Sequence, residues 1–215
     1  EAHCTVSGSV KVTVLYTSEE AVGLRSLSVS VPFSCVLDDR SLAGCGTLFA
    51  EGRVLLAEAR AVTSRKLYVK VMPEITVTGY RAVKRRIACG VQDGAAICTR
   101  RQKLELSLLT AVSEKGFSFT DDVLLDNGCT PEDILLHRVC PTILSAQRLG
   151  NKLMVKGEMQ LCVLYRDDGQ TLRQYDAALP FSQILDVAEL PEDAEYTLCP
   201  QIGECDIRVM RTDSG

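Results

Sequence analysis

Apolar and polar residues alternate along much of this chain, and one alternating pattern occurs twice. Residues 6–16 are VSGSVKVTVLY and residues 155–165 are VKGEMQLCVLY, with five residues identical and in the same places. Apolar side chains recur at every second position, which is the period of a pleated strand with one face toward a core. Each copy is therefore predicted to be a strand.

A second repeated stretch follows each strand after a short polar connection. Residues 32–38 are PFSCVLD and residues 180–186 are PFSQILD. The spacing between the copies changes by one residue from the first stretch to the second, so the deletion is predicted to lie in the connecting loop, where it is tolerated.

A third, weaker sequence match extends the repeat toward the C-terminal end of each copy. Residues 67–72 (LYVKVM) correspond to residues 205–210 (CDIRVM), and both are predicted to be extended. We expect the two copies to superpose as equivalent sets of strands. The copies span 6–72 and 155–210, with Tyr16 in the place of Tyr165 and Phe33 in the place of Phe181.

Further strands are predicted between the copies. Leu27, Val29 and Val31 alternate with serines, which indicates a half-buried strand with a polar face. Residues 54–62 suit a helix as well as a strand, and we favour a strand because their neighbours are strands. Residues 117–125 are predicted to be a further short strand.

The strongest hairpin signal lies within residues 80–109. Asp93-Gly94 is a preferred two-residue hairpin turn, because both of its central positions need positive φ. This turn would place Cys89 opposite Cys98 on an apolar face. They are predicted to be packed thiols, with a disulfide as the alternative.

One short helix is predicted to begin after Thr130. Thr130 can cap it, Pro131 suits its first position, and Glu132 and Asp133 place negative charge at the positive end of the helix dipole. Apolar residues up to Val139 would bury one face before a proline ends the helix.

Strands and turns dominate these expectations, so the fold is predicted to be all-β and sandwich-like. It would consist of two related β-rich units joined by one short helix. The first unit is expected to span residues 1–128. The second unit is expected to span residues 129–215 and to be truncated.

Composition and charge narrow the classes of function. The 215 residues are 46% hydrophobic and 24% charged, and the formal net charge is −4. No apolar run is long enough for a membrane span, and the acidic balance argues against nucleic acid as the partner. The sequence begins with Glu1 and no leader pattern follows, so a fragment or a processed form is expected.

Candidate catalytic and metal-binding groups are few. His3 lies near the start of the chain, and His137 falls in the last turn of the predicted helix, where the helix dipole favours a cation. The acidic pairs Asp38-Asp39, Asp121-Asp122 and Asp167-Asp168 lack the spacing of a calcium loop and are expected in solvated loops. The ten cysteines contain no Cys-x-x-Cys pair, which favours reduced cysteines. We therefore predict no enzyme activity, no cofactor and no metal.

One set of charges is a candidate binding surface. In the predicted hairpin four basic residues share one face, and like charges that oppose each other on a sheet are unfavourable unless they meet an acidic partner. The alternative is a solvated face that discourages edge pairing. The residues are Lys84, Arg86, Arg101 and Lys103.

The repeated motifs resemble a known family. The sequence VKG at 155–157, LCVLY at 161–165 and LPF at 179–181, preceded by EDIL at 132–135, is similar to the SPOCS domain of SipL-like proteins from endospore-forming bacteria. The first copy resembles the same pattern through VKVTVLY at 10–16.

This resemblance implies a role in sporulation. Proteins of the family take part in spore coat or envelope morphogenesis. They act from the mother-cell cytoplasm at the forespore surface and bind other coat morphogenetic proteins, notably the ATPase of the coat's basement layer. Family members commonly carry a C-terminal LysM module, and the second repeat here is expected to end before one.

The sequence therefore predicts a non-enzymatic structural or protein-interaction module of the spore coat or envelope. The alternative is an extracellular β-sandwich that binds carbohydrate or peptidoglycan. That alternative is weakened because tryptophan is absent, and few aromatic residues remain for sugar stacking.

Overall fold

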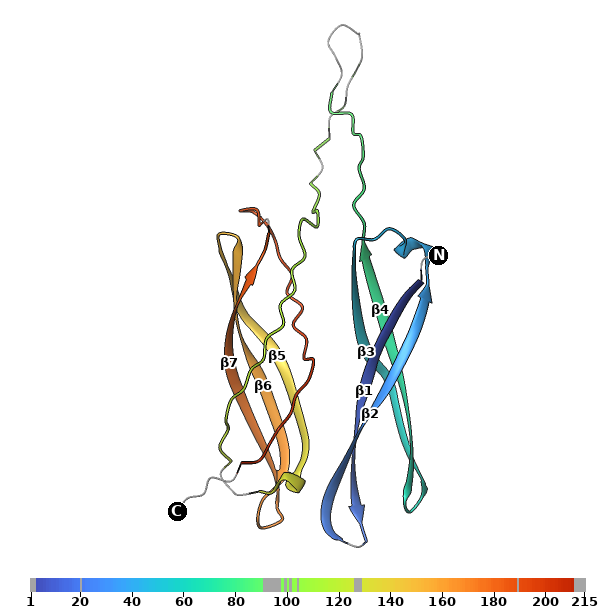
Figure 1. Ribbon diagram of the computed structural model, residues 1–215, viewed down its shortest axis with the longest axis vertical. Coiled ribbons are helices and arrows are strands. Elements are labelled where there is room, and N and C mark those ends of the chain that lie inside the picture. The colour runs from blue at the N-terminus through green and yellow to red at the C-terminus, as the bar shows by residue number, and fades with distance from the viewer. Residues whose placement is uncertain are drawn as a thin grey trace. The chain divides into compact units, whose positions relative to one another are not determined.

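The computed structural model describes residues 3–19, 21–90, 98, 100, 102–103, 105–125, 129–188 and 190–210. Its described residues form seven strands in three sheets, which confirms the all-β prediction (Figure 1). The elements are β1 (His3–Ser18), β2 (Ala21–Asp38), the 3-10 turn η1 (Arg40–Leu42), β3 (Thr47–Thr63), β4 (Lys66–Tyr80), the 3-10 turn η2 (Pro131–Asp133), β5 (Ile134–Leu149), β6 (Lys152–Arg166) and β7 (Leu172–Asp186).

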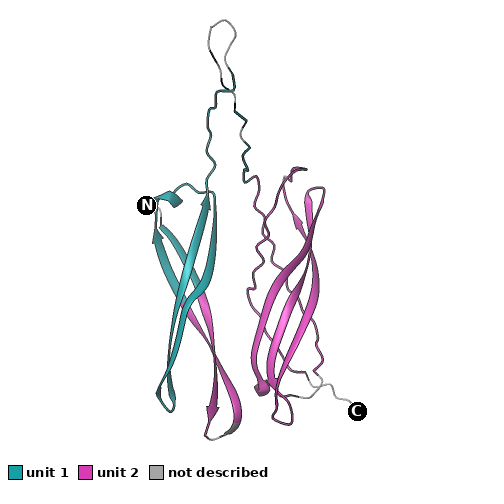
Figure 2. Cartoon of the chain, turned by 180° about the vertical axis from the view of Figure 1, so that it is seen from behind, with its two compact units in different colours: residues 1–8, 33–109 teal, residues 9–32, 110–215 magenta. Residues whose placement is uncertain are grey.

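The chain divides into two compact units (Figure 2). Unit 1 comprises residues 1–8 and 33–109, and unit 2 comprises residues 9–32 and 110–215. The predicted division at residues 128 and 129 stays a prediction. Among the described residues, none of the helical segments has the length and apolar character needed to cross a membrane.

The first copy of the repeat begins with the hairpin of β1 and β2. Both strands agree with the alternation in the sequence, and the hydroxyls of Thr13 and Ser28 lie 3.0 Å apart across the hairpin. The apolar face of β2 was predicted to be buried. This is wrong, because its side chains Leu27, Val29 and Val31 are each about half exposed. A two-stranded sheet covers less of its own apolar surface than a larger sheet does.

Strands β3 and β4 form a second antiparallel hairpin, with Thr63 opposite Lys66 at its turn. Residues 54–62 lie in β3, so the strand reading of this ambiguous stretch is confirmed. Phe49 and Tyr80 meet edge to face at the far end, with ring centroids 5.9 Å apart. The long ladder and this aromatic contact define the register of the hairpin.

The second copy of the repeat lies in a three-stranded antiparallel sheet with the order β5-β6-β7. The central strand β6 provides the buried core, in which Leu161, Val163 and Tyr165 pack together. Val123 and Leu125 from the preceding segment and Ile207 from the following one pack against them. Figure 1 shows both segments running along this sheet.

The predicted helix after Thr130 is wrong. Only Pro131–Asp133 are helical, as the single 3-10 turn η2, and the chain then continues as β5. Val139 lies opposite Leu161 on β6, so the apolar residues expected on one face of a helix are used in strand pairing instead. Helix-start signals are weak beside the burial gained by joining a sheet.

Several predicted strands are absent from the described part of the chain. Residues 81–90, 105–109 and 117–125 are extended segments outside any strand. Leu106 and Leu108 are mostly exposed, so the alternation on which the prediction rested does not bury a face here. The Asp93-Gly94 turn itself lies outside the described residues.

The two copies of the repeat correspond only in part. Both begin with a hairpin, and the Gly8 and Phe33 pair matches the Gly157 and Phe181 pair, because in each the ring lies against the glycine. Residues 205–210, however, form no strand, whereas residues 67–72 lie in β4.

Burial also differs between the copies. Tyr16 is 40% exposed and Tyr165 is 4% exposed, so the prediction that they share one environment is wrong. The difference follows from sheet size, because β6 has neighbours on both edges and β1 pairs with β2 alone among the described strands.

Candidate functional site

The predicted basic face is only partly described. Lys84 and Arg86 are exposed and lie outside any strand, and Arg101 is not among the described residues. The ammonium group of Lys103 lies 3.0 Å from Glu105, a contact between two highly exposed side chains. A shared face for these four residues therefore stays a prediction.

The cysteines predicted to pack in the same hairpin do not do so. Cys89 and Cys98 are both free and exposed, so the packed-thiol prediction is wrong. The Cys89 thiol lies 3.5 Å from the backbone oxygen of Ile87, which is a local contact. Both cysteines lie outside any strand.

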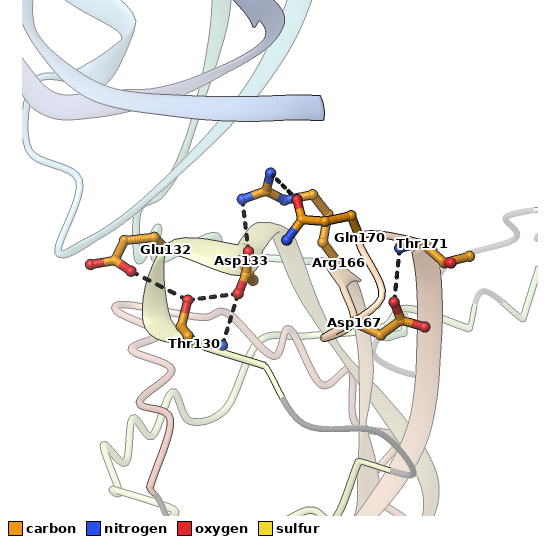
Figure 3. Close-up of polar contacts among 7 residues, drawn as sticks. All are labelled: Thr130, Glu132, Asp133, Arg166, Asp167, Gln170 and Thr171. Carbon is orange, nitrogen blue, oxygen red and sulfur yellow. Dashed lines mark hydrogen bonds and ion pairs between the residues drawn. The ribbon is translucent and has the colours of Figure 1, made fainter. Parts of the chain in front are cut away.

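A cluster of polar side chains connects the start of β5 to the turn between β6 and β7 (Figure 3). At its centre Arg166 donates from one terminal nitrogen to Asp133 at 2.7 Å and from the other to Gln170 at 3.0 Å. The side chains of Arg166 and Asp133 are only 12% and 11% exposed. This ion pair is therefore largely removed from water.

Asp133 also holds the turn that precedes β5. Its carboxylate accepts bonds from the backbone N–H and the hydroxyl of Thr130, at 3.0 and 2.6 Å. The pKa of Asp133 is lowered, chiefly by the Thr130 hydroxyl bond, with further contributions from the Thr130 backbone N–H and Arg166. All three contacts stabilise the ionised carboxylate.

Asp167 organises the turn between β6 and β7. Its carboxylate accepts from the Thr171 backbone N–H at 2.8 Å and from Arg173 at 3.0 Å. The pKa of Asp167 is lowered, first by the Thr171 backbone bond and then by Arg173. The two carboxylates of the cluster are thus ionised acceptors bound by donors, an arrangement that stabilises the end of the sheet.

An aromatic contact forms a second feature of the same sheet. Gly157 on β6 lies opposite Phe181 on β7, and the Phe181 ring packs over the glycine. Phe117 from the preceding segment lies against Phe181, with ring centroids 5.5 Å apart. The ring of Phe181 therefore fills the space that a side chain at position 157 would occupy.

The segments beside the sheet are joined to it by hydrogen bonds. Ser113 and Lys115 donate to the backbone oxygens of Asp186 and Ile184, both at 2.8 Å. The hydroxyl of Tyr196 donates to the backbone oxygen of Ala146 on β5 at 2.9 Å. The segment before the sheet thus bonds to β7, and the segment after it bonds to β5.

The two histidines occupy places that the sequence did not predict. His137 lies in β5 opposite Val163, so the expected place at the end of a helix is wrong. Its pKa is lowered, mainly by burial and then by the nearby Lys11 ammonium group. His3 contacts the carboxylate of Asp38.

The acidic pairs were expected in solvated loops. This expectation is wrong for Asp38, which ends β2, and for Asp167, which is only 6% exposed. Asp39 accepts from the backbone N–H of Ser41 and caps η1, and Asp121 accepts from the N–H of Asp122. Among the described residues, no group of three or more acidic, histidine or cysteine side chains is arranged to hold a metal ion.

Sequence reasoning missed the central residue of the polar cluster. Arg166 directly follows the repeated strand, but the first copy has Thr17 at that position, so the repeat gave no signal for it. Asp133 was noticed only as a charge at a helix start. The Gly157 and Phe181 contact could have been found, because both residues lie in repeated stretches and recur together as Gly8 and Phe33.

Together the sheet, its two flanking segments and the polar cluster define a small all-β domain built on strands β5 to β7. Residues 130–210 match the family model described as SipL, SPOCS domain. This match confirms the resemblance to the SPOCS domain of SipL-like proteins over this part of the chain and indicates a sporulation-related module. No curated protein and no solved structure gives a significant match.

Proposed function

We propose that the chain is a non-enzymatic interaction module that helps to assemble the spore coat or envelope. The observation that carries this proposal is the SPOCS match over residues 130–210, which coincides with the most completely packed domain of the chain. The buried carboxylates of this domain, Asp133 and Asp167, accept hydrogen bonds from donors of the same domain, so they stabilise the fold.

The exposed surfaces of the two hairpins support binding to other proteins. Large apolar side chains on β1 to β4 remain at least two-fifths exposed, and such surfaces are typical of interaction sites. Examples are Leu27, Val36, Val54, Leu55, Leu67 and Tyr68. We propose that the partners are coat morphogenetic proteins, among them the ATPase of the basement layer.

A binding experiment tests the proposal and the basic residues together. The purified chain is immobilised, and its affinity for the basement-layer ATPase is measured by interferometry. The double variant Lys84→Glu and Arg86→Glu should bind at least tenfold more weakly, because two attractive charges at an acidic partner become repulsive.

The control variant has the same change in charge at other exposed positions. Lys152→Glu with Lys156→Glu should retain the affinity of the unchanged chain, since both lysines are exposed and lie on β6, outside the two hairpins and the basic residues. Equal affinity in both double variants would exclude the basic residues from the interface. Absence of binding by the unchanged chain would contradict the proposed partner.

We further propose that the chain works in the reducing mother-cell cytoplasm, at the forespore surface. In support of this, all ten cysteines are free. Burial raises the pKa of the Cys129 and Cys205 thiols, which favours the protonated thiol over the reactive thiolate.

Thiol titration checks this proposal. Protein purified and denatured without reductant should react with a thiol reagent at close to all ten cysteines. The folded protein should react at fewer, because partly buried thiols such as Cys129 are shielded. A denatured count of two or fewer would indicate disulfides and an oxidising location instead.

A further inference from the structure

Positive charge is concentrated in one stretch of an otherwise acidic chain. Residues 81–109 contain seven of the 24 lysine and arginine residues but only two of the 28 acidic residues. The formal net charge of the whole chain is −4, so the remainder is more acidic than this total. A basic stretch within an acidic chain indicates a partner with a negatively charged surface.

The described residues of this stretch, which we name the basic segment, are accessible to a partner. They lie outside any strand, and Figure 1 shows the chain leaving the end of β4 without joining the β3–β4 sheet. Glu105, the one acidic residue described in the segment, contacts Lys103. The exposed basic side chains are Lys84, Arg85, Arg86, Arg100 and Lys103.

Large aliphatic side chains lie among these charges and are also exposed. Ile87 directly follows Arg86 and is 73% exposed, and Leu106 and Leu108 are 72% and 77% exposed. Aliphatic side chains of this size are unfavourable in water, and a group of them indicates a binding surface. The basic segment therefore offers a partner both positive charge and apolar side chains.

An anionic lipid bilayer matches both features at once. Its headgroups attract lysine and arginine side chains, and the boundary between headgroups and acyl chains accepts aliphatic side chains. Such a surface needs no shape complementarity, which suits a segment that lies outside any strand. An acidic protein would need a groove fitted to the aliphatic side chains, and a nucleic acid attracts a protein mainly through its phosphate charge.

We propose that the basic segment binds the surface of a bilayer rich in anionic lipid. Lys84, Arg85 and Arg86 contact the headgroups, and Ile87 enters the boundary with the acyl chains. This inference goes beyond the proposed function, because it requires no coat protein. The two activities are compatible, since the exposed apolar side chains of β1 to β4 lie outside the basic segment.

Vesicle sedimentation is the first test. The full chain should bind vesicles made from equal amounts of phosphatidylcholine and phosphatidylglycerol, and it should bind vesicles of phosphatidylcholine alone at least tenfold more weakly. Raising the salt from about 0.1 to about 1 M shortens the screening length from about 10 to about 3 Å, so it should weaken binding to the anionic vesicles. Equal binding to the two kinds of vesicle, or no binding to either, would overturn the inference.

Neutral substitutions test the basic residues. Each lysine or arginine near an anionic membrane surface strengthens binding about fivefold. The triple variant Lys84→Gln, Arg85→Gln and Arg86→Gln should therefore bind the anionic vesicles at least tenfold more weakly. All three side chains are exposed, so the variant should keep its fold, which circular dichroism checks.

The matched control loses the same charge at three exposed residues elsewhere. The variant Lys152→Gln, Lys156→Gln and Arg208→Gln should bind the anionic vesicles as the unchanged chain does. Equal losses of affinity in the two triple variants would show that only the net charge matters and would overturn the inference.

A fluorescent probe tests the apolar contact. The chain contains no tryptophan, so one introduced tryptophan reports its own surroundings. In Ile87→Trp the emission should shift to shorter wavelengths when anionic vesicles are added, because the indole ring enters the membrane interface. In Leu124→Trp, at a side chain that is 82% exposed outside the basic segment, the emission should stay unchanged. No shift in Ile87→Trp, or an equal shift in Leu124→Trp, would overturn the inference.

Two further measurements distinguish a lipid surface from other anionic partners. Poly-glutamate and duplex DNA should bind the chain more weakly than the anionic vesicles do; equal or tighter binding of either polymer would overturn the inference. Affinity for the coat ATPase is measured without lipid, and vesicle binding without the ATPase. If the ATPase binds and the vesicles do not, the membrane inference is wrong while the proposed function stands. The reverse result would contradict the proposed partner alone.

Discussion

Replacing Asp133 by alanine should lower the free energy of unfolding by about 3–5 kcal/mol, the cost of leaving a buried charge without its partner. The Arg166 side chain is 12% exposed, and its Nε atom already has no hydrogen-bond partner. The substitution also removes the acceptor for the Thr130 hydroxyl and backbone N–H. Chemical denaturation followed by circular dichroism measures the loss.

An exposed ion pair provides the control. Asp206 accepts from Arg208 at 2.8 Å, but these side chains are 61% and 85% exposed. Asp206→Ala should therefore cost less than about 1 kcal/mol, since water screens the pair and solvates the remaining charge. Equal losses of unfolding free energy in the two variants would show that burial of the Asp133 and Arg166 pair does not increase its contribution to stability.

The same carboxylate should make stability depend on pH. The pKa of Asp133 is lower in the folded chain than its ordinary value, so the folded state favours the ionised form. Its contribution is present above the unfolded pKa of about 3.9 and is lost as the pH falls through the folded pKa. Asp133→Asn should weaken this acid-induced loss, which denaturation at pH values between about 2 and 6 would reveal.

The strands were predictable where alternation coincides with a hairpin. β1, β2, β6 and β7 appear where the repeated stretches placed them, because period-two patterns and short polar connections leave few other solutions. The same period-two pattern wrongly predicted a strand with a buried face at Leu106 and Leu108, whose side chains are exposed. Alternation shows that a face could be buried, and whether it is buried depends on a second surface elsewhere in the chain.

The start of β5 shows how tertiary pairing overrides local signals. Thr130, Pro131 and Asp133 satisfy the chemistry of a helix start, and they do so within one 3-10 turn. The following residues then pair with β6, and no local signal contains that partner. The polar cluster was missed for a related reason, because Asp133 and Arg166 are brought together only when β5 lies beside β6.

Replacing Gly157 by alanine should lower the free energy of unfolding by about 3 kcal/mol, at the upper end of the usual cost of overpacking. A Cβ atom at this position would lie 2.4 Å from the backbone oxygen of Thr142 on β5 and 2.6 Å from the Phe181 ring. The ring is itself packed against Phe117, and the oxygen belongs to a paired strand. The sheet must therefore separate locally, which thermal and chemical denaturation would detect.

Gly8 is the matched control, because it has the same place in the first copy of the repeat. The three atoms nearest to a Cβ atom there all belong to the Phe33 ring, the closest at 2.9 Å. The ring can move, and alanine restricts the unfolded chain more than glycine does, so Gly8→Ala should change stability by less than about 1 kcal/mol. A loss as large as that at Gly157 would mean that a third strand also covers β1 in solution, in the place where β5 covers β6.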